Sequence, residues 1–282
     1  MSPMQQLIDV LTLEQIEVNL FRGRSYPEER GRIFGGQVIA QALIAAHVTV
    51  EGRGCHSLQA YFIRPGDPEI PVLYEVERSR DGKSFTTRRV IAIQKGEQIL
   101  NLAASFQVEE QGFEHQSALP DVPGPEQLTS MSEIWAELAK RAPERFAAAA
   151  ERERPIEIRP INPIDLLDPK PSTPLQRVWM RAIEPVEGVV MNKALLAYAS
   201  DMSLLGTCIR PHGVSFAKGV QAASLDHILW FHRPVEMHEW HLYDQDSPSA
   251  SGARGFNRGA LYRRDGTLVA SVAQEGLIRP RT

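Results

Sequence analysis

The sequence predicts an α+β fold made of two similar units, each with a curved antiparallel sheet wrapped around one central helix. The first observation is an internal repeat, because "AYFIRPGD" (60–67) has a counterpart in "LWFHRPVE" (229–236). The spacing that follows is also equal, since Ser105 lies 41 positions after Arg64 and Gln274 lies 41 positions after Arg233. The second observation is a helix of small apolar residues upstream of each set of strand-like runs. Agreement over so long a segment indicates a duplication.

The first central helix is predicted at 34–50, in the segment "FGGQVIAQALIAAHVTV". The segment is apolar on nearly every side and contains neither Asp nor Glu, which is typical of a helix buried all round. Gly35 and Gly36 carry no side chains, so we expect them to allow close packing where the helix begins.

The strands of both units are predicted from alternating or β-branched runs that glycine turns separate. In the first unit these runs are "RVIAIQ" (89–94) and "ILNLAASF" (99–106). In the second unit they are "ALYRR" (260–264) and "TLVASVAQ" (267–274). Each pair of runs is typical of two antiparallel neighbours in a sheet.

The segment between the two copies has a different composition. Residues 120–174 hold 10 of the 20 prolines, and one short helix is expected within "TSMSEIWAELAKRAPERFAAAAERE" (129–153). We therefore divide the chain into an N-terminal unit (1–111), a connector (112–154) and a C-terminal unit (155–282). Because prolines limit the slack of the connector, we expect the units to pack against each other.

The second central helix is predicted at 193–205, in "KALLAYASDMSLL", and it contains a single aspartate. At helical spacing Asp201 shares its face with Ala197, Tyr198 and Leu204. A carboxylate in such surroundings costs several kcal/mol unless it is paired or hydrogen-bonded. The residues alone leave two interpretations open, a functional acid–base group or a satisfied structural carboxylate.

Composition excludes several classes of function. A net charge of −4 offers no broad attraction for nucleic acid or for an anionic membrane. The isolated cysteines, Cys55 and Cys208, predict no disulfide framework and favour a reducing compartment. We expect no signal peptide, no transmembrane helix and no peroxisomal address, and a cytoplasmic location follows by elimination.

Several motifs, in one order along residues 5–280, together resemble the acyl-CoA thioesterase II (TesB-type) family. These motifs are "FGGQVIAQAL", "YFIRPGD", "DGKSFTTR", "AYASD", "DHILWFHRP", "ARGF" and "VAQEGLIR". The resemblance implies a double hot-dog fold and hydrolysis of fatty acyl-CoA to free acid and CoA, with no metal or organic cofactor.

The resemblance also implies a set of catalytic residues. In that family an Asp, a Thr or Ser, and a Gln orient and activate a water at the thioester. The matching motifs place these at Asp201 in "YASD", at Ser224 before "DH" and at Gln274 in "QEG". An ionised aspartate can take a proton from water, and a hydroxyl and an amide can hold that water by hydrogen bonds.

Comparison of the two copies predicts one working site per chain. An ungapped alignment from the Arg-Pro pairs matches Gln274 with Ser105 and Ser224 with Cys55, and the first helix lacks a carboxylate. We therefore expect the site to belong to the second copy, with the first copy as its scaffold.

The sequence also allows other mechanisms and functions. Asp226 and His227 beside Ser224 suggest a Ser-His-Asp nucleophile, although the chain has no G-x-S-x-G motif. His227 and His232 point to opposite faces of a strand, which argues against a shared metal. The alternative functions are a hot-dog acyl-CoA hydratase or dehydratase and a non-catalytic acyl-CoA binding module.

Two expectations concern partners. Arginine suits phosphate recognition, and the candidates for contacting the CoA phosphates are Arg64, Arg88, Arg89, Arg254 and Arg258. Free sheet edges invite pairing, so a homo-oligomer, a dimer or a tetramer, is expected.

Overall fold

The computed structural model describes residues 1–26, 31–217 and 219–281, and within them the strands form one curved sheet in which neighbours pair antiparallel. From one edge to the other, the strands are β1 (Glu14–Glu17), β2 (Leu20–Gly23), β4 (Val72–Asp81), β5 (Phe85–Gln94), β6 (Glu97–Gln107), β3 (Gly54–Phe62), β10 (Asp226–Phe231), β13 (Leu268–Pro280), β12 (Arg254–Arg263), β11 (His241–Ser251), β8 (Leu175–Ala182) and β7 (Ile156–Pro160). A short strand, β9 (Val220–Ser224), pairs with the end of β13. The predicted α+β class is confirmed.

The two repeats meet in the middle of this sheet. Strand β3 of the first repeat pairs antiparallel with β10 of the second, with Leu58 opposite Leu229. On each side of this junction the strands follow the same order outward, β6, β5 and β4 on one side and β13, β12 and β11 on the other. The duplication therefore produces one continuous sheet with a local two-fold arrangement at its centre.

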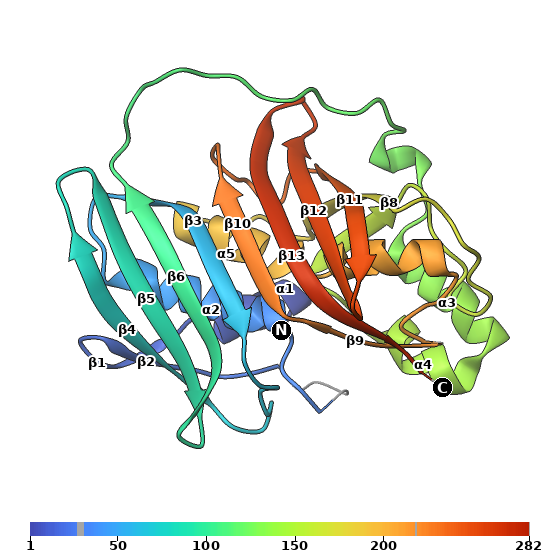
Figure 1. Cartoon of the computed structure of the whole chain (residues 1–282), viewed down its shortest axis with the longest axis horizontal. Helices are drawn as coiled ribbons and strands as arrows, with labels where there is room; N and C mark the ends of the chain where they lie inside the picture. The colour runs from blue at the N-terminus through green and yellow to red at the C-terminus, as the bar shows by residue number, and fades with distance from the viewer. Residues whose placement is uncertain (27–30, 218, 282) are drawn as a thin grey trace.

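The two central helices, α2 (Gly35–Val48) and α5 (Val189–Ser200), lie side by side on one face of the sheet (Figure 1). They run antiparallel, because Gly36 at the start of α2 lies against Tyr198 near the end of α5. Alanines line the two helices and are fully buried: Ala40, Ala42, Ala45, Ala46, Ala194, Ala197 and Ala199. Small side chains let the two helices approach each other and the sheet closely.

The second central helix ends earlier than predicted. It runs from Val189 to Ser200, Asp201 is its C-cap, and a 3₁₀ helix, η2 (Leu204–His212), follows. The Ser200 hydroxyl donates to the carbonyl of Ala197, a local bond that competes with continuing the helix. Asp201 is therefore a helix-terminal residue rather than one inside a helix.

The connector contains two helices, α3 (Met131–Arg141) and α4 (Pro143–Glu151), where one was expected. Pro143 disfavours the helical conformation for the residue before it, so the chain breaks at Ala142. The predicted N-terminal cap is confirmed as a capping box between Ser130 and Glu133.

The connector is tied to the second repeat. Trp179 on β8 donates from its indole N–H to the carbonyl of Pro123, and Arg264 pairs with Glu126 at 2.7 Å. Figure 1 shows this segment crossing from β6 to the far side of the second repeat. The remaining helices are α1 (Pro3–Leu11) and a short 3₁₀ turn, η1 (Pro125–Gln127). No helix in the described part of the chain has the length and apolar character needed to span a membrane.

Candidate functional site

The side chains of Asp201, Ser224 and Gln274 meet at one point although they come from three elements. Gln274 Nε2 on β13 donates to Asp201 Oδ1 at 2.6 Å, and Ser224 Oγ at the end of β9 donates to the same oxygen at 3.3 Å. The three residues span 73 positions of the sequence, and β9 and β13 are brought together by their antiparallel pairing. The structure thus gathers the three residues that the resemblance implies.

A backbone group of the first repeat completes the surroundings of Asp201. The backbone N–H of Gly36, in the first turn of α2, donates a hydrogen bond to the Asp201 carboxylate. Gly35 lies against Asp201 Oδ2, and a Cβ on Gly35 would come within 2.8 Å of that oxygen. The partly positive start of α2 thus faces the carboxylate and stabilises its negative charge. This attraction offsets the repulsion between the carboxylate and the partly negative C-terminal end of α5.

Burial changes the protonation of this carboxylate. The Asp201 side chain is only 4% exposed, and loss of solvation raises its pKa to about 6. The hydrogen bonds from Gln274, Ser224 and Gly36 favour the ionised form and limit the rise in pKa. Asp201 can therefore exchange a proton near neutral pH.

Sequence reasoning missed the contacts that His227 makes within this site. Its imidazole is fully buried, and desolvation lowers its pKa to about 3, so the ring is neutral. Nδ1 lies 3.1 Å from Gln274 Nε2, and Nε2 lies 2.8 Å from Ser200 Oγ. The motif "DH" is the only sequence signal for this histidine, and nothing local shows that its ring reaches both Gln274 and α5.

The arrangement does not form a Ser-His-Asp nucleophile. The His227 ring bonds Ser200 rather than Ser224, and Asp226 Oδ1 accepts from the backbone N–H of Glu275. His232 is exposed and bonds Ser271, so the two histidines point away from each other as the strand pattern predicts.

The structure pairs residues of the two repeats with an offset that differs by one residue from the ungapped sequence alignment. In both repeats, the Arg of the Arg-Pro pair and the residue before it donate their backbone N–H groups to one carbonyl, that of Ile99 in the first and Val269 in the second. Counting five residues onward, Gln274 corresponds to Ala104. The match with Ser105 is wrong.

The cause is a longer turn in the second repeat. Strands β5 and β6 are joined by a two-residue turn between the paired residues Gln94 and Glu97. Between β12 and β13, the backbone N–H of Arg263 donates to the carbonyl of Thr267, which leaves three residues in the turn. One extra residue moves every later side chain to the other face of a strand, which is why an ungapped alignment fails here.

The corresponding place in the first repeat has a different chemistry. There the end of α2 meets the start of α5, and Cys55 occupies the position of Ser224. Lys193 Nζ donates to the carbonyl of Cys55 at 2.7 Å, and burial raises the pKa of the Cys55 thiol to about 12. The residues that line this hollow include no carboxylate: Leu43, His47, Gly54, Cys55, Val189, Val190 and Lys193.

The arginines suggested for CoA phosphates are all engaged with carboxylates. The ion pairs are Arg64–Glu97, Arg88–Asp81, Arg89–Glu77, Arg254–Glu275 and Arg258–Asp246.

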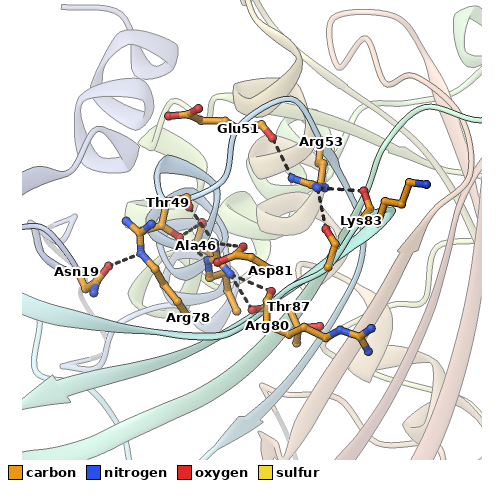
Figure 2. Close-up of polar contacts among 12 residues, drawn as sticks. Asn19, Ala46, Thr49, Glu51, Arg53, Arg78, Arg80, Asp81, Lys83 and Thr87 are labelled. Carbon is orange, nitrogen blue, oxygen red and sulfur yellow. Dashed lines mark hydrogen bonds and ion pairs between the residues drawn. The ribbon is translucent and has the colours of Figure 1, made fainter.

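Arg88 is the least available of these arginines. Its side chain is 2% exposed and reaches the last turn of α2, where Thr49 accepts through both its hydroxyl and its carbonyl. The guanidinium also donates to the carbonyls of Arg80 and Thr87, and Figure 2 shows these groups converging with Asp81. Arg88 is thus committed to the fold.

Comparison with known proteins identifies the family. Two family models match the chain, the acyl-CoA thioesterase N-terminal domain over residues 25–107 and acyl-CoA thioesterase over residues 149–277. Human acyl-coenzyme A thioesterase 8 is 43% identical over 280 residues, which are 96% of this chain and 88% of that protein. The chain belongs to the acyl-CoA thioesterase family. The resemblance found in the motifs is confirmed.

Two further members of the acyl-CoA thioesterase family align over almost their entire length. Acyl-CoA thioesterase 2 of Haemophilus influenzae is 40% identical and covers 98% of both chains. The crystal structure of the acyl-CoA thioesterase II TesB2 from Mycobacterium marinum superposes with a TM-score of 0.80 at 40% identity, covering 98% of each chain. The predicted hot-dog fold and the predicted activity, acyl-CoA thioester hydrolysis, are confirmed at the level of the family.

Proposed function

We propose that Asp201, Ser224 and Gln274 are the catalytic residues with which this chain hydrolyses acyl-CoA thioesters. The supporting observation is that the two oxygens of the Asp201 carboxylate have different surroundings. Its Oδ1 accepts from both Ser224 and Gln274, whereas Oδ2 faces Gly35, which has no side chain to cover it. Asp201 thus has one oxygen held in place, and its other oxygen, Oδ2, is the one that would accept from the water molecule of the proposed reaction.

In the proposed step, ionised Asp201 removes a proton from water as the water oxygen attacks the thioester carbonyl carbon. The C–O bond forms and the carbonyl oxygen takes up negative charge. When the intermediate collapses, the C–S bond breaks, and the proton held by Asp201 passes to the departing CoA thiolate. The products are CoA with a free thiol and a carboxylic acid, which ionises in solution.

We further propose one working site per chain. In the first repeat, Ser224 and Gln274 are replaced by Cys55 and Ala104, and a thiol whose pKa is about 12 cannot serve as a base at neutral pH. The boundaries at 1–111, 112–154 and 155–282 and a cytoplasmic location remain part of the proposal.

Assembly into a homo-oligomer, a dimer or a tetramer, is proposed on two features of the sheet. Tyr61 on β3, one of the two central strands, is 63% exposed, and in the described part of the chain β1 and β7 end the sheet. Exposed apolar groups and free edges favour association with another copy.

The experiment compares matched positions of the two repeats by following free-thiol release from decanoyl-CoA. Asp201→Asn is expected to lower kcat by about 10²–10⁴, because it removes the base. Ser224→Ala is expected to lower kcat by about 10-fold to 100-fold through misplacement of the carboxylate. Cys55→Ser, at the matching position of the first repeat, is expected to stay within about twofold of the parent. Near-normal turnover by Asp201→Asn would refute the assignment.

A further inference from the structure

The hydrogen bonds around His227 form a chain in which each donor can be assigned. The Ser200 hydroxyl donates its one hydrogen to the carbonyl of Ala197, at 3.0 Å. Ser200 Oγ can therefore only accept from the ring nitrogen 2.8 Å away, so His227 Nε2 carries the ring hydrogen. Because the imidazole is neutral, its Nδ1 is then a lone-pair acceptor.

This tautomer determines how the Gln274 amide is turned. Gln274 Nε2 lies 2.6 Å from Asp201 Oδ1 and 3.1 Å from His227 Nδ1, and both of these atoms are acceptors. The two hydrogens of the amide nitrogen satisfy them. With the amide turned over, its oxygen would face the carboxylate oxygen and the imidazole lone pair, which is repulsive.

The consequence is a free acceptor in the site. Gln274 Oε1 is buried and has no hydrogen-bond partner within the described residues. A buried carbonyl oxygen without a partner costs free energy unless a donor reaches it. A water molecule between Asp201 and the thioester supplies such a donor, because one of its hydrogens can go to Gln274 Oε1 and the other to the carboxylate.

We propose that His227 is a positioning residue that holds the Gln274 amide with Oε1 toward the attacking water, a role that rests on the proposed function of Asp201 and Gln274. Both hydrogens of the water then point at acceptors, and an oxygen lone pair is left for the thioester carbonyl carbon. His227 does not touch the substrate and exchanges no proton in the reaction.

The test uses variants that differ in the acceptor at the Nδ1 position. His227→Asn keeps an amide oxygen near that position, whereas His227→Leu replaces the ring by an apolar group of similar size. His241→Leu is the matched control, because His241 is another fully buried, neutral histidine of the second repeat whose Nδ1 bonds the carbonyl of Glu239. For each variant, kcat, KM, the pH profile and the urea midpoint are measured with decanoyl-CoA.

For His227→Leu, kcat is expected to fall by about tenfold or more while KM changes less than about twofold, because the water loses its orientation but the substrate contacts remain. The acidic limb of the profile is expected to move to higher pH, since Asp201 loses the amide N–H that favours its charged form. His227→Asn is expected to recover most of kcat and the position of the limb. His241→Leu is expected to lower only the urea midpoint.

The acidic limb of the pH profile reports the ionisation of Asp201, because the other titratable groups that face Asp201 stay neutral. His227 on β10 has a lowered pKa, and the pKa of Tyr243 on β11 lies well above its usual value. Asp226 and Glu275 lie on the opposite side of their strands from His227 and Gln274. There the Asp226 carboxylate accepts from the backbone N–H of Glu275, and the Glu275 carboxylate accepts from Arg254.

Two results would overturn the positioning role. In the first, His227→Leu folds and keeps the parent kcat and acidic limb while Asp201→Asn is inactive. In the second, His227→Asn loses as much kcat as His227→Leu. Failure of the proposed function is distinguishable, because it shows as turnover retained by Asp201→Asn itself.

Discussion

At the scale of single residues, the burial of the Asp201 carboxylate prepares the site for its proposed chemistry but lowers the stability of the fold. Its carboxylate is withdrawn from water, and the hydrogen bonds that it accepts only partly replace the lost solvation, so its pKa is about 6. The same burial keeps His227 neutral and frees it to accept a hydrogen bond. Loss of solvation thus raises the pKa of Asp201 and lowers the pKa of its neighbour His227, and both pKa shifts suit the proposed chemistry.

The pH dependence of turnover follows from the Asp201 shift. The base must be ionised, so kcat/KM is expected to fall as the pH drops below about 6. The measurement is kcat/KM for decanoyl-CoA from about pH 4.5 to pH 9. A profile that stays flat down to pH 4.5 would contradict this role for Asp201.

The same shift predicts how stability depends on pH. The folded pKa of about 6 lies above the unfolded value of about 3.9, so the stabilisation that protonation provides is complete below pH 4 and is lost as the pH rises through 6. Asp201→Asn does not titrate. Its free energy of unfolding relative to the parent is therefore expected to rise by about 2 kcal/mol between pH 4 and pH 7, measured by urea denaturation. An unchanged difference would show that the folded pKa is not raised.

At the scale of elements, the last turn of α2 depends on Arg88 from β5. The guanidinium donates to the cap residue Thr49 and to strand carbonyls, and its positive charge lies at the negative end of the helix. An arginine in an alternating strand would ordinarily be assigned to the surface. Its burial results from the sheet curving around a helix end that needs donors.

Removal of this arginine is expected to destabilise the fold. Arg88→Met leaves the carbonyl and the hydroxyl of Thr49, at the end of α2, without the donors that Arg88 supplies, and the free energy of unfolding is expected to fall by roughly 2–4 kcal/mol. The matched control is Arg89→Met on the exposed face of the same strand, where the pair with Glu77 at 3.6 Å is worth less than about 1 kcal/mol. Urea denaturation measures both variants, and equal losses would contradict the capping role.

At the scale of the whole molecule, the site lies where the two repeats meet. Antiparallel packing of α2 and α5 brings the beginning of one helix to the end of the other, so a backbone N–H of the first repeat reaches a carboxylate of the second. The first repeat is therefore more than a distant scaffold, because it supplies part of the surroundings of Asp201. At the junction related to it by the local two-fold arrangement, Lys193 donates instead to the carbonyl of Cys55.

This arrangement predicts that a change in the first repeat impairs the site in the second. A Cβ at Gly36 would overlap the backbone carbonyl of Tyr198, so Gly36→Ala must push the helices apart. We expect a stability loss of roughly 2 kcal/mol and a fall in kcat/KM of about tenfold. At the two-fold-related junction, a Cβ on Gly54 would meet only Lys193 Nζ, at 3.4 Å, so Gly54→Ala is expected to keep both values. Equal kcat/KM in the two variants would contradict a site shared between the repeats.

The duplication, the two small-residue helices, the main strands and the family could all be predicted from the sequence, because they depend on local periodicity and on motifs that are read along the chain. It also predicted Asp201, Ser224 and Gln274, through the family motifs. The three-dimensional arrangement was needed to see that Asp201 caps a helix, that Gly36 donates to it, and that the His227 ring contacts Gln274. These contacts depend on which helix ends and strand faces meet, and a single extra residue in a turn is enough to change that pairing without disturbing the local pattern.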